Sequence, residues 1–237
     1  MLEDGQGCSK PFAGFALLHV HGEPSSACLL CTFMAHRLLL LAAGGLPSDG
    51  VAAQLASAAH EVIAVDGGLR HAQHLGVAVD IVLGDLDSVA PADAEGRTSV
   101  HLPDQDRTDL SKSLSWCMVH RHGAHVDVVG LDGGRLDHRQ AVAAALVESG
   151  SDAVLHLEEG SLRRCPPGAA FDLPVAEGTI LGLHPMGVVR GVHLQGTLHD
   201  LANVTLRTGT KGVHNVATSA RIRLQVEEGD LVLSIAR

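Results

Sequence analysis

The sequence predicts an α/β protein in which a Rossmann-like domain with a parallel sheet precedes a smaller all-β domain of the sandwich or barrel type. Three observations support this prediction. Short apolar runs alternate with helix-like segments from Leu38 to about Leu157. A stretch containing Pro and Gly at 164–168 then marks a change in composition. Beyond it the helical periodicity disappears, and only β-like runs follow.

The first half of the chain supplies the elements of the parallel sheet. Its predicted strands are apolar runs at 38–42, 62–65, 80–83, 99–102, 126–129 and 153–156. The predicted helices and their N-caps are Ser48 before 49–60, Thr108 before 109–121 and Asp137 before 138–148. Gln140 completes a capping-box spacing in the third helix, and Gly150 is expected to end it. Strands that alternate with helices predict a parallel sheet covered on both faces.

The second half is predicted to contain strands only. These are expected at 178–184, 188–195, 202–207, 219–226 and 231–235. In the last two runs apolar residues alternate with polar ones, and residues 227–230 are expected to form the turn between them. The sequence therefore predicts an α/β catalytic domain over 36–160 and a β domain over 170–237.

Residues 1–35 differ from the rest of the chain. They lack the basic start of a signal peptide, and Pro24 and neighbouring polar residues interrupt their apolar runs. Since Met34 stands just before the first predicted strand, we interpret residues 1–35 as an extension that the domain does not need. No run approaches the roughly 20 apolar residues that a membrane span requires, so no membrane partner is expected.

Charge and cysteine usage narrow the function classes. A formal charge of −10 argues against binding a nucleic-acid backbone, which calls for clustered Lys and Arg. It leaves nucleotides open, because a bound metal ion can invert the local field. The five cysteines are odd in number and lack a framework spacing, which favours reduced thiols and a cytoplasmic location. Cys28 and Cys31 have the C-x-x-C spacing, but no second ligand pair follows, so we favour chance.

Three acidic clusters follow predicted strands. They are Gly84-Asp85-Leu86-Asp87-Ser88, Asp104-Gln105-Asp106-Arg107-Thr108-Asp109 and Gly133-Gly134-Arg135-Leu136-Asp137-His138. The carboxyl ends of parallel strands meet at one edge of an open α/β sheet, where ligands bind. Carboxylate-bearing loops at this edge predict a site for a divalent metal and a polyphosphate.

Two pairs of residues are the main candidates for that chemistry. In an extended loop, the side chains of Asp85 and Asp87 point the same way, roughly 6–7 Å apart at the backbone, which suits one Mg²⁺. The alternative is an Asx-turn that uses each carboxylate locally. Asp109 begins a helix, and Lys112 lies one turn further along. This pair either holds a metal and a phosphate or forms a surface ion pair.

The other candidates also have two interpretations each. Gln105 either binds the ring edge of a ligand or bonds its own loop. Arg135 has a planar fork suited to phosphate, whereas Asp137 is well explained as an N-cap. The pairs Gly44-Gly45 and Gly67-Gly68 either let a ligand approach the backbone or permit tight turns. Neither G-x-x-x-x-G-K-[ST] nor G-x-G-x-x-G occurs, so metal, scattered basic side chains and backbone amides must hold the phosphates.

The ordered set of motifs resembles the thiamine pyrophosphokinase family. The resemblance covers roughly 37–237 and rests on Asp66-Gly67-Gly68, the segments 84–88 and 104–109, Lys112, and the segment 133–138. It implies a transfer of the terminal diphosphate of ATP to the hydroxyethyl oxygen of thiamine, with release of AMP. It also implies a homodimer in which thiamine binds between the catalytic domain of one subunit and the β domain of the other.

The resemblance also implies roles for individual residues. Asp85, Asp87 and Asp109 would hold Mg²⁺, and Gln105 would contact the thiamine pyrimidine. The nucleotide side would be lined by Arg135, Asp137 and His138. The further residues expected at the catalytic and ligand-binding site are Gly44, Gly45, Asp66, Gly67, Gly68, Thr108, Lys112 and Asn215.

The chain departs from the family pattern in the β domain. Members usually carry a Ser-Asn pair near thiamine, whereas here Asn215 is retained and His214 stands in the Ser position. The only Trp is Trp116, so this region supplies no aromatic ring to stack on thiamine. Two alternatives therefore stay open: a pyrophosphokinase with another acceptor, such as a hydroxymethylpterin, and a non-catalytic sensor that binds nucleotide or thiamine diphosphate.

Overall fold

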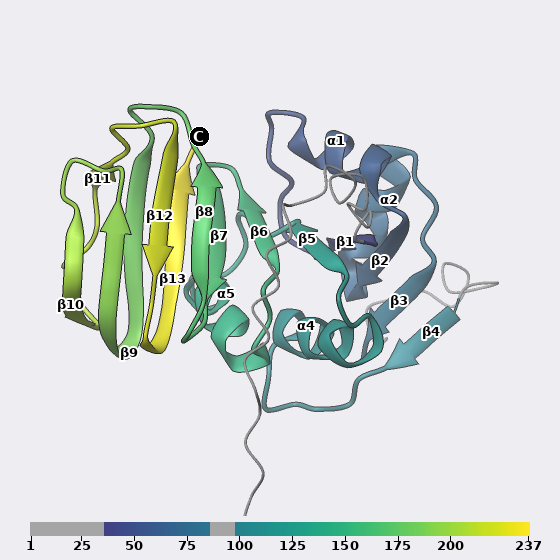
Figure 1. Cartoon of the computed structure of the whole chain (residues 1–237). Coiled ribbons are helices and arrows are strands. Elements are labelled where there is room, and N and C mark those ends of the chain that lie inside the picture. The colour runs from purple at the N-terminus through teal and green to yellow at the C-terminus, as the bar shows by residue number, and fades with distance from the viewer. Residues whose placement is uncertain (1–35, 86–97) are drawn as a thin grey trace, which may run out of the picture. The chain divides into compact units, whose positions relative to one another are not determined.

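Parallel strands form the first part of the sheet in the computed structural model, which describes residues 36–85 and 98–237 (Figure 1). The strands are β1 (Arg37–Leu41), β2 (Glu61–Val65), β3 (Ile81–Gly84), β4 (Thr98–His101), β5 (His125–Val129) and β6 (Val154–Leu157). They lie in the order β4-β3-β2-β1-β5-β6, and every neighbouring pair among them is parallel. The predicted α/β class and the parallel strands are confirmed.

Helices cover both faces of this parallel part because its strands are apolar on both sides. Leu38 and Leu40 point into one core, whereas Leu39 and Leu41 point into another. The first core includes side chains of α4 (Asp109–His120) and α5 (Leu136–Ser149). The second includes side chains of α1 (Val51–Ala58) and α2 (Leu69–Leu75), which follows the short helix η1 (Asp66–Gly68). In Figure 1, α1 and α2 lie above the strands and α4 and α5 below them.

The helix caps were predicted with mixed success. Thr108 caps α4 as expected, since its side chain accepts from Ser111 N at 3.3 Å, and Gly150 ends α5 in the left-handed conformation. The Ser48 cap is wrong, because α1 begins at Val51 after Gly50, which is left-handed at φ 81°.

The predicted cap of the third helix is also wrong. The left-handed glycines Gly133 and Gly134 turn the chain early, so α5 begins at Leu136 and Asp137 lies inside its first turn. Arg135 occupies the N-cap position without a side-chain cap bond, so the capping box with Gln140 is not formed.

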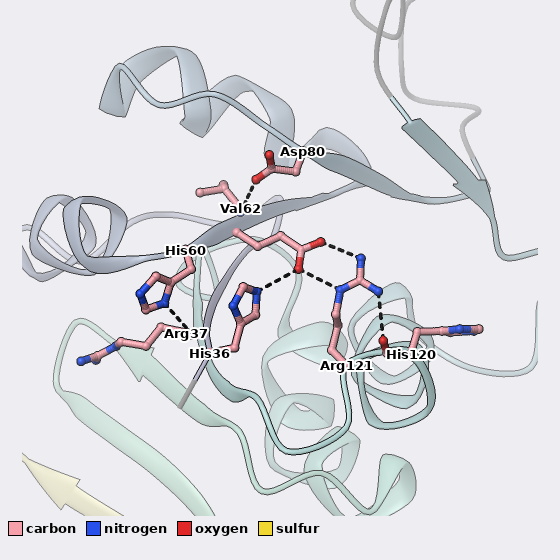
Figure 2. A network of polar contacts seen from close by, with 8 residues as sticks. His36, Arg37, His60, Val62, Asp80, His120 and Arg121 are labelled. Atoms are coloured by element: carbon pink, nitrogen blue, oxygen red, sulfur yellow. Dashed lines mark hydrogen bonds and ion pairs between the residues drawn. The ribbon is translucent and has the colours of Figure 1, made fainter. Parts of the chain in front are cut away.

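A polar network ties the amino ends of β1 and β2 to the end of α4 (Figure 2). The Glu61 carboxylate accepts two hydrogen bonds from Arg121, at 2.7 and 2.8 Å, and His36 lies 3.4 Å from the same carboxylate. The bonds from Arg121 lower the pKa of Glu61. His36 also stacks on His60. These histidines therefore lie at the edge opposite to the strand carboxyl ends, in a structural network.

The second half of the described chain consists of antiparallel strands. They are β7 (Gly160–Cys165), β8 (Ala170–Pro174), β9 (Ile180–Gln195), β10 (Leu201–Arg207), β11 (Asn215–Val216), β12 (Arg221–Gln225) and β13 (Glu228–Ala236). The prediction missed β7, β8 and β11, and the expected runs at 178–184 and 188–195 are one long strand, β9. Alternating residues of β9, β12 and β13 fill the core of this half.

The expected turn at 227–230 is wrong, because β13 already begins at Glu228, and the last two strands do not pair with each other. β12 pairs with β8 and with His193–Gln195 of β9, whereas β13 pairs with β7 and with the first part of β9. Both strands alternate apolar and polar residues because both contribute to the same core, although β9 lies between them in the sheet. The short connection at 226–227 therefore moves the chain from one side of β9 to the other.

The strands of the two halves belong to one continuous hydrogen-bonded sheet. β6 and β7 form an antiparallel hairpin, and the strand order continues as β7-β13-β9-β12-β8. Ala35–Arg237 forms one compact unit. The division into domains at 36–160 and 170–237 stays a prediction, and the expected extension 1–35 lies outside the described residues. Within the described ranges, no helix has the length and apolar character that crossing a membrane requires.

Candidate functional site

The candidate site lies where β1 and β5 run side by side. β2, β3 and β4 extend the sheet beyond β1, and β6 extends it beyond β5, so the strand order reverses here. In open α/β sheets, ligands bind at the carboxyl ends of the strands at such a reversal. The β1 loop (residues 42–45) and the β5 loop (residues 130–134) meet at this point. Gly44 N donates to Gly130 O at 2.7 Å.

A pocket of about 680 Å³ opens at these loops. It brings together most of the predicted site residues from both sides of the reversal. Those that line it are Gly44, Asp66, Asp85, Gln105, Thr108, Asp109, Lys112, Arg135 and His138. The predicted residues that do not line it are Gly45, Gly67, Gly68, Asp137 and Asn215. Asp87 lies outside the described residues.

Asp109 and Lys112 form the best-defined ion pair of the pocket. Lys112 Nζ lies 2.7 Å from Asp109 Oδ1 and donates to the carbonyl of Leu102 at 3.2 Å. The Lys112 side chain is 5% exposed, whereas that of Asp109 is 41% exposed. A lysine is rarely buried without a specific partner, so the surface-pair interpretation does not hold for Lys112. The structure places a desolvated cation on the wall of the pocket.

Two further carboxylates reach the same edge from neighbouring strands. Asp66 follows β2 and Asp85 follows β3. Asp66 adopts φ 47°, a conformation that costs a non-glycine residue energy and is often found at functional sites. Within 36–85 and 98–237, no group of three His, Cys, Asp or Glu residues is arranged to hold a metal ion. Since Asp87 lies outside these ranges, the predicted metal ligands stay a prediction.

The glycine pairs are explained first by backbone packing. A Cβ on Gly68 would lie 1.8 Å from Leu41 O, and one on Gly44 would lie 2.6 Å from Gly130 O. By contrast, a Cβ on Gly67 would meet Ala43 Cβ at an ordinary 3.4 Å. Gly68 and Gly44 must therefore be glycines, because the main chain of another segment approaches each of them closely.

The sequence analysis missed the residues of α2 that hold the β1 loop. Arg70 donates to the carbonyl of Ala43, and His71 Nε2 lies 2.6 Å from the carbonyl oxygen of Gly44. Because a carbonyl only accepts, Nε2 of His71 carries a proton. Burial lowers the pKa of His71, which favours the neutral ring. The clue was the pair Gly67-Gly68 just before them, but no helix was predicted there.

Arg107 was also missed. It lines the pocket, and its guanidinium bonds Asp104 at 2.7 Å and the hydroxyl of Ser115 at 3.1 Å. These two bonds tie the loop before α4 to the body of that helix.

Arg135 stands at the exposed mouth of the pocket. Its guanidinium pairs with Asp137 at 2.6 Å, and the two side chains are 77% and 58% exposed. The bond from Arg135 lowers the pKa of Asp137. An exposed ion pair of this kind contributes little to the stability of the fold. Arg135 can therefore leave the Asp137 carboxylate for a phosphate with little loss of stability.

Asn215 lies away from this pocket. Its amide donates to Thr197 Oγ1 and to His199 O, and its carbonyl oxygen accepts from His199 N and Val216 N, all within 2.9–3.0 Å. The side chain is thus used to hold the chain at 197–199. The neighbouring His214, left-handed at φ 60°, lines a second and largely apolar pocket of about 280 Å³.

The segment that forms much of this pocket is similar to a known family. A family model described as thiamin pyrophosphokinase, catalytic domain, matches residues 52–155. Over this segment the chain is similar to the thiamine pyrophosphokinase family. A curated relative, thiamin pyrophosphokinase 1 of Caenorhabditis elegans, is 38% identical over 73 residues. That alignment covers 28% of this chain and 30% of the worm protein, so it spans less than a third of the relative.

Solved structures of thiamin pyrophosphokinases share the fold. The family protein from Enterococcus faecalis superposes with a TM-score of 0.71 at 19% identity, covering 85% of this chain and 99% of that one. The Bacillus subtilis protein gives 0.68 at 21%, covering 84% and 99%. The Candida albicans protein gives 0.69 at 15%, covering 85% and 89%. Because these identities are low, the likeness shows a shared fold and nothing beyond it.

The match to the thiamine pyrophosphokinase catalytic domain covers much of the pocket. Residues 52–155 include Asp66, Asp85, Asp109, Lys112 and Arg135. The β1 loop precedes the matched segment, and Asn215 and His214 follow it. Residues 52–155 are therefore similar to the family in sequence, whereas the likeness of the β half rests on the fold alone.

Proposed function

We propose that this protein transfers the terminal diphosphate of ATP to thiamine, giving thiamine diphosphate and AMP. The observation that carries the proposal is the pocket at the reversal of strand order, where Asp85, Asp109 and the buried Lys112 meet. A polyphosphate requires positive charge, and such a pocket in an open α/β sheet is the usual place for a nucleotide. The match of residues 52–155 to the thiamin pyrophosphokinase catalytic-domain model supports the same activity.

We infer that Asp85, Asp87 and Asp109 hold Mg²⁺. The donor set fits, because carboxylate oxygens are the protein ligands that Mg²⁺ prefers, and two of the three line one pocket. When bound, the ion neutralises charge on the phosphate oxygens during displacement at the β-phosphorus.

The chain's own residues then position the substrates. Lys112, already desolvated beside Asp109, would bind a non-bridging phosphate oxygen, and Arg135 would move from Asp137 to another. Gln105 would bind the ring edge of the acceptor. Catalysis by this set would come mainly from in-line positioning and charge neutralisation.

The acceptor and the assembly are the finer parts of the proposal. We propose a homodimer in which the β half of one subunit completes the acceptor site of the other. His214 in place of the family Ser favours one alternative, a different acceptor such as a hydroxymethylpterin. A sensor without catalysis is disfavoured, because binding alone gives no reason to keep both the acids and the buried Lys112. The cytoplasmic location stays a prediction.

Incubating the purified protein with ATP, Mg²⁺ and thiamine tests the function. We expect AMP and thiamine diphosphate in equal amounts by chromatography, and neither product in the presence of EDTA. AMP formed only with a hydroxymethylpterin would overturn the acceptor assignment. No AMP with any acceptor, despite measurable ATP binding, would favour the sensor.

A further inference from the structure

A polar network behind the pocket connects the loop after β1 to the hairpin of β6 and β7. We call it the Glu158 clamp, and its members are Ser48, Asp49, Asp132, Glu158 and Arg237. None of them lines the pocket of about 680 Å³. The clamp joins parts of the chain that are far apart in sequence, and its bonds are independent of the ion pairs described above.

Glu158 is the centre of the clamp. Its carboxylate accepts from Ser48 N at 2.7 Å and from the Ser48 hydroxyl. Its own backbone N donates to Asp132 Oδ2 at 2.9 Å. One residue of the β6–β7 turn thus holds the chain after β1 and the chain after β5 together. This also accounts for Ser48, which the sequence assigned to a helix cap.

Asp132 connects Glu158 to the loops that line the pocket. It forms an isolated antiparallel bridge with Gly45, in which Gly45 N donates at 2.5 Å and Asp132 N donates at 3.2 Å. The adjacent Gly44 N donates to Gly130 O, and both Gly44 and Gly130 line the pocket. The β1 and β5 loops therefore hold each other, and the side chain of Asp132 ties the pair to Glu158.

Arg237 closes the clamp from the end of β13. Its guanidinium lies 2.8 Å from Asp49 Oδ2, and its backbone N donates to Glu159 O at 3.1 Å. The other carboxylate oxygen of Asp49 accepts from Val51 N at 3.1 Å, at the start of α1. The residue that follows the last strand thus braces the segment between β1 and α1.

We propose that the Glu158 clamp positions the β1 and β5 loops for the polyphosphate of the nucleotide. The inference rests on the proposed function, since it assigns these loops to the ATP side of the reaction. Glycines without side chains expose peptide groups to a ligand, but those groups help only if they are held in place. Because the clamp bonds these loops from outside the pocket, its members are positioning residues.

The proposal predicts a selective kinetic defect. Glu158→Ala and Ser48→Ala should each raise KM for ATP or lower kcat, by about 10-fold in kcat/KM, with KM for thiamine nearly unchanged. The double variant should be no worse than Glu158→Ala, because Glu158→Ala already removes the hydroxyl bond that Ser48→Ala removes. Ser48→Thr, which keeps the hydroxyl donor, should restore activity. The matched control is Asp172→Ala, which breaks the 2.7 Å pair with Arg221 in the β half and should leave the kinetics unchanged.

Hydrogen exchange gives a readout that needs no activity. In Glu158→Ala, backbone amides of residues 42–45 and 130–134 should exchange faster, while those of β9 and β13 stay protected. Unchanged exchange in these loops together with an unchanged KM for ATP would overturn the clamp. If Glu158→Ala does not fold, Glu158→Gln, which keeps one side-chain acceptor but removes the negative charge, replaces it in the same tests.

Failure of the clamp and failure of the proposed function are separable. If the wild-type protein forms no AMP, the proposed function fails on that result alone. The clamp is then judged by loop exchange and by the affinity for a non-hydrolysable ATP analogue, compared between wild type and Glu158→Ala. Equal affinity and equal exchange would overturn it, whereas a weaker affinity with faster exchange would support it.

Discussion

Gly68 lies so close to Leu41 that a Cβ built on the glycine would stand 1.8 Å from the leucine's carbonyl oxygen. The neighbour is backbone at the end of β1, which cannot move aside as a flexible side chain can. This contact sets how closely η1 packs on the strand that begins the β1 loop.

Gly68→Ala is therefore expected to lower the free energy of unfolding by about 1–3 kcal/mol, because the added methyl group overpacks a backbone contact. Gly67→Ala is the matched control, since its Cβ would meet Ala43 at 3.4 Å. Urea denaturation of both variants makes the comparison. Equal stability of the two would contradict the packing argument.

Lys112→Met is expected to reduce kcat/KM for diphosphate transfer by about 10²–10³, because a desolvated cation facing the phosphates is lost. The fold should survive, since the partner carboxylate of Asp109 is 41% exposed and can be solvated. The control is Lys211→Met, which removes an exposed lysine of the β half. AMP release measures both variants, and similar activities would remove Lys112 from the site.

Asp85→Asn and Asp87→Asn are each expected to abolish turnover while the thermal midpoint stays close to that of wild type. The reason is that a neutral amide binds Mg²⁺ far more weakly than a carboxylate. Asp152→Asn, at an exposed position before β6, is the control. AMP formation is measured against Mg²⁺ concentration. Activity retained by both variants at saturating Mg²⁺ would exclude these aspartates from the metal site.

The contribution of Asp127 to the stability of the fold is expected to be lost at acid pH. Burial raises its pKa, but bonds from His125 and His156, with His156 Nε2 at 2.8 Å, outweigh burial and hold the pKa well below its usual range. A depressed pKa gives stability that is present above about pH 4 and is lost as the pH falls further. Asp127→Asn should therefore be less stable than wild type by about 2–3 kcal/mol at pH 6, with a smaller gap at pH 2–3.

Denaturant titrations at several pH values measure this gap. For comparison, Asp172→Asn alters an exposed ion pair and should change stability by less than about 1 kcal/mol at pH 6. If the difference in stability between wild type and Asp127→Asn stays constant from pH 6 to pH 2, the stabilisation by Asp127 does not depend on its charge, and the prediction is wrong.

Substitutions of Asn215 and His214 are expected to have different effects, the first on stability and the second on acceptor binding. Asn215→Ala should lower the free energy of unfolding by about 1–3 kcal/mol, because it removes the side-chain bonds to the buried Thr197 and to the backbone of His199. His214→Ser should change stability by less than about 0.5 kcal/mol and change KM for the acceptor. Denaturation and acceptor competition measure the two effects. A stable Asn215→Ala variant with a raised KM for thiamine would instead make Asn215 a ligand-binding residue.

Much of the parallel sheet could be predicted because its signal is local. The runs that became β1, β2, β3 and β5 are short and mostly apolar, and a strand buried on both faces needs little else. Asp85, Asp109 and Arg135, one residue from each acidic cluster, line the same pocket, since parallel strands present their carboxyl ends together. The i,i+3 spacing of Asp109 and Lys112 likewise required only the helix that Thr108 caps.

Other features could not be predicted, because their partners are distant in the sequence. Ser48 looks like a helix cap, yet Glu158, 110 residues away, uses its hydroxyl. Arg70 and His71 hold the β1 loop from a helix that has no strong local signal. Asn215 matches a family ligand position, but its amide is taken up by residues 16 to 18 positions away.

The sequence by itself determined the α/β class, the edge of the sheet that carries the carboxylates, and the resemblance to the thiamine pyrophosphokinase family. These depend on apolar periodicity and on residue types at fixed spacings along the chain. Only the tertiary structure decided that β9 separates β12 from β13, that Lys112 is buried, and that the glycine pairs serve backbone contacts. Those outcomes depend on which surfaces pack together, and packing is a property of segments brought together from across the whole chain.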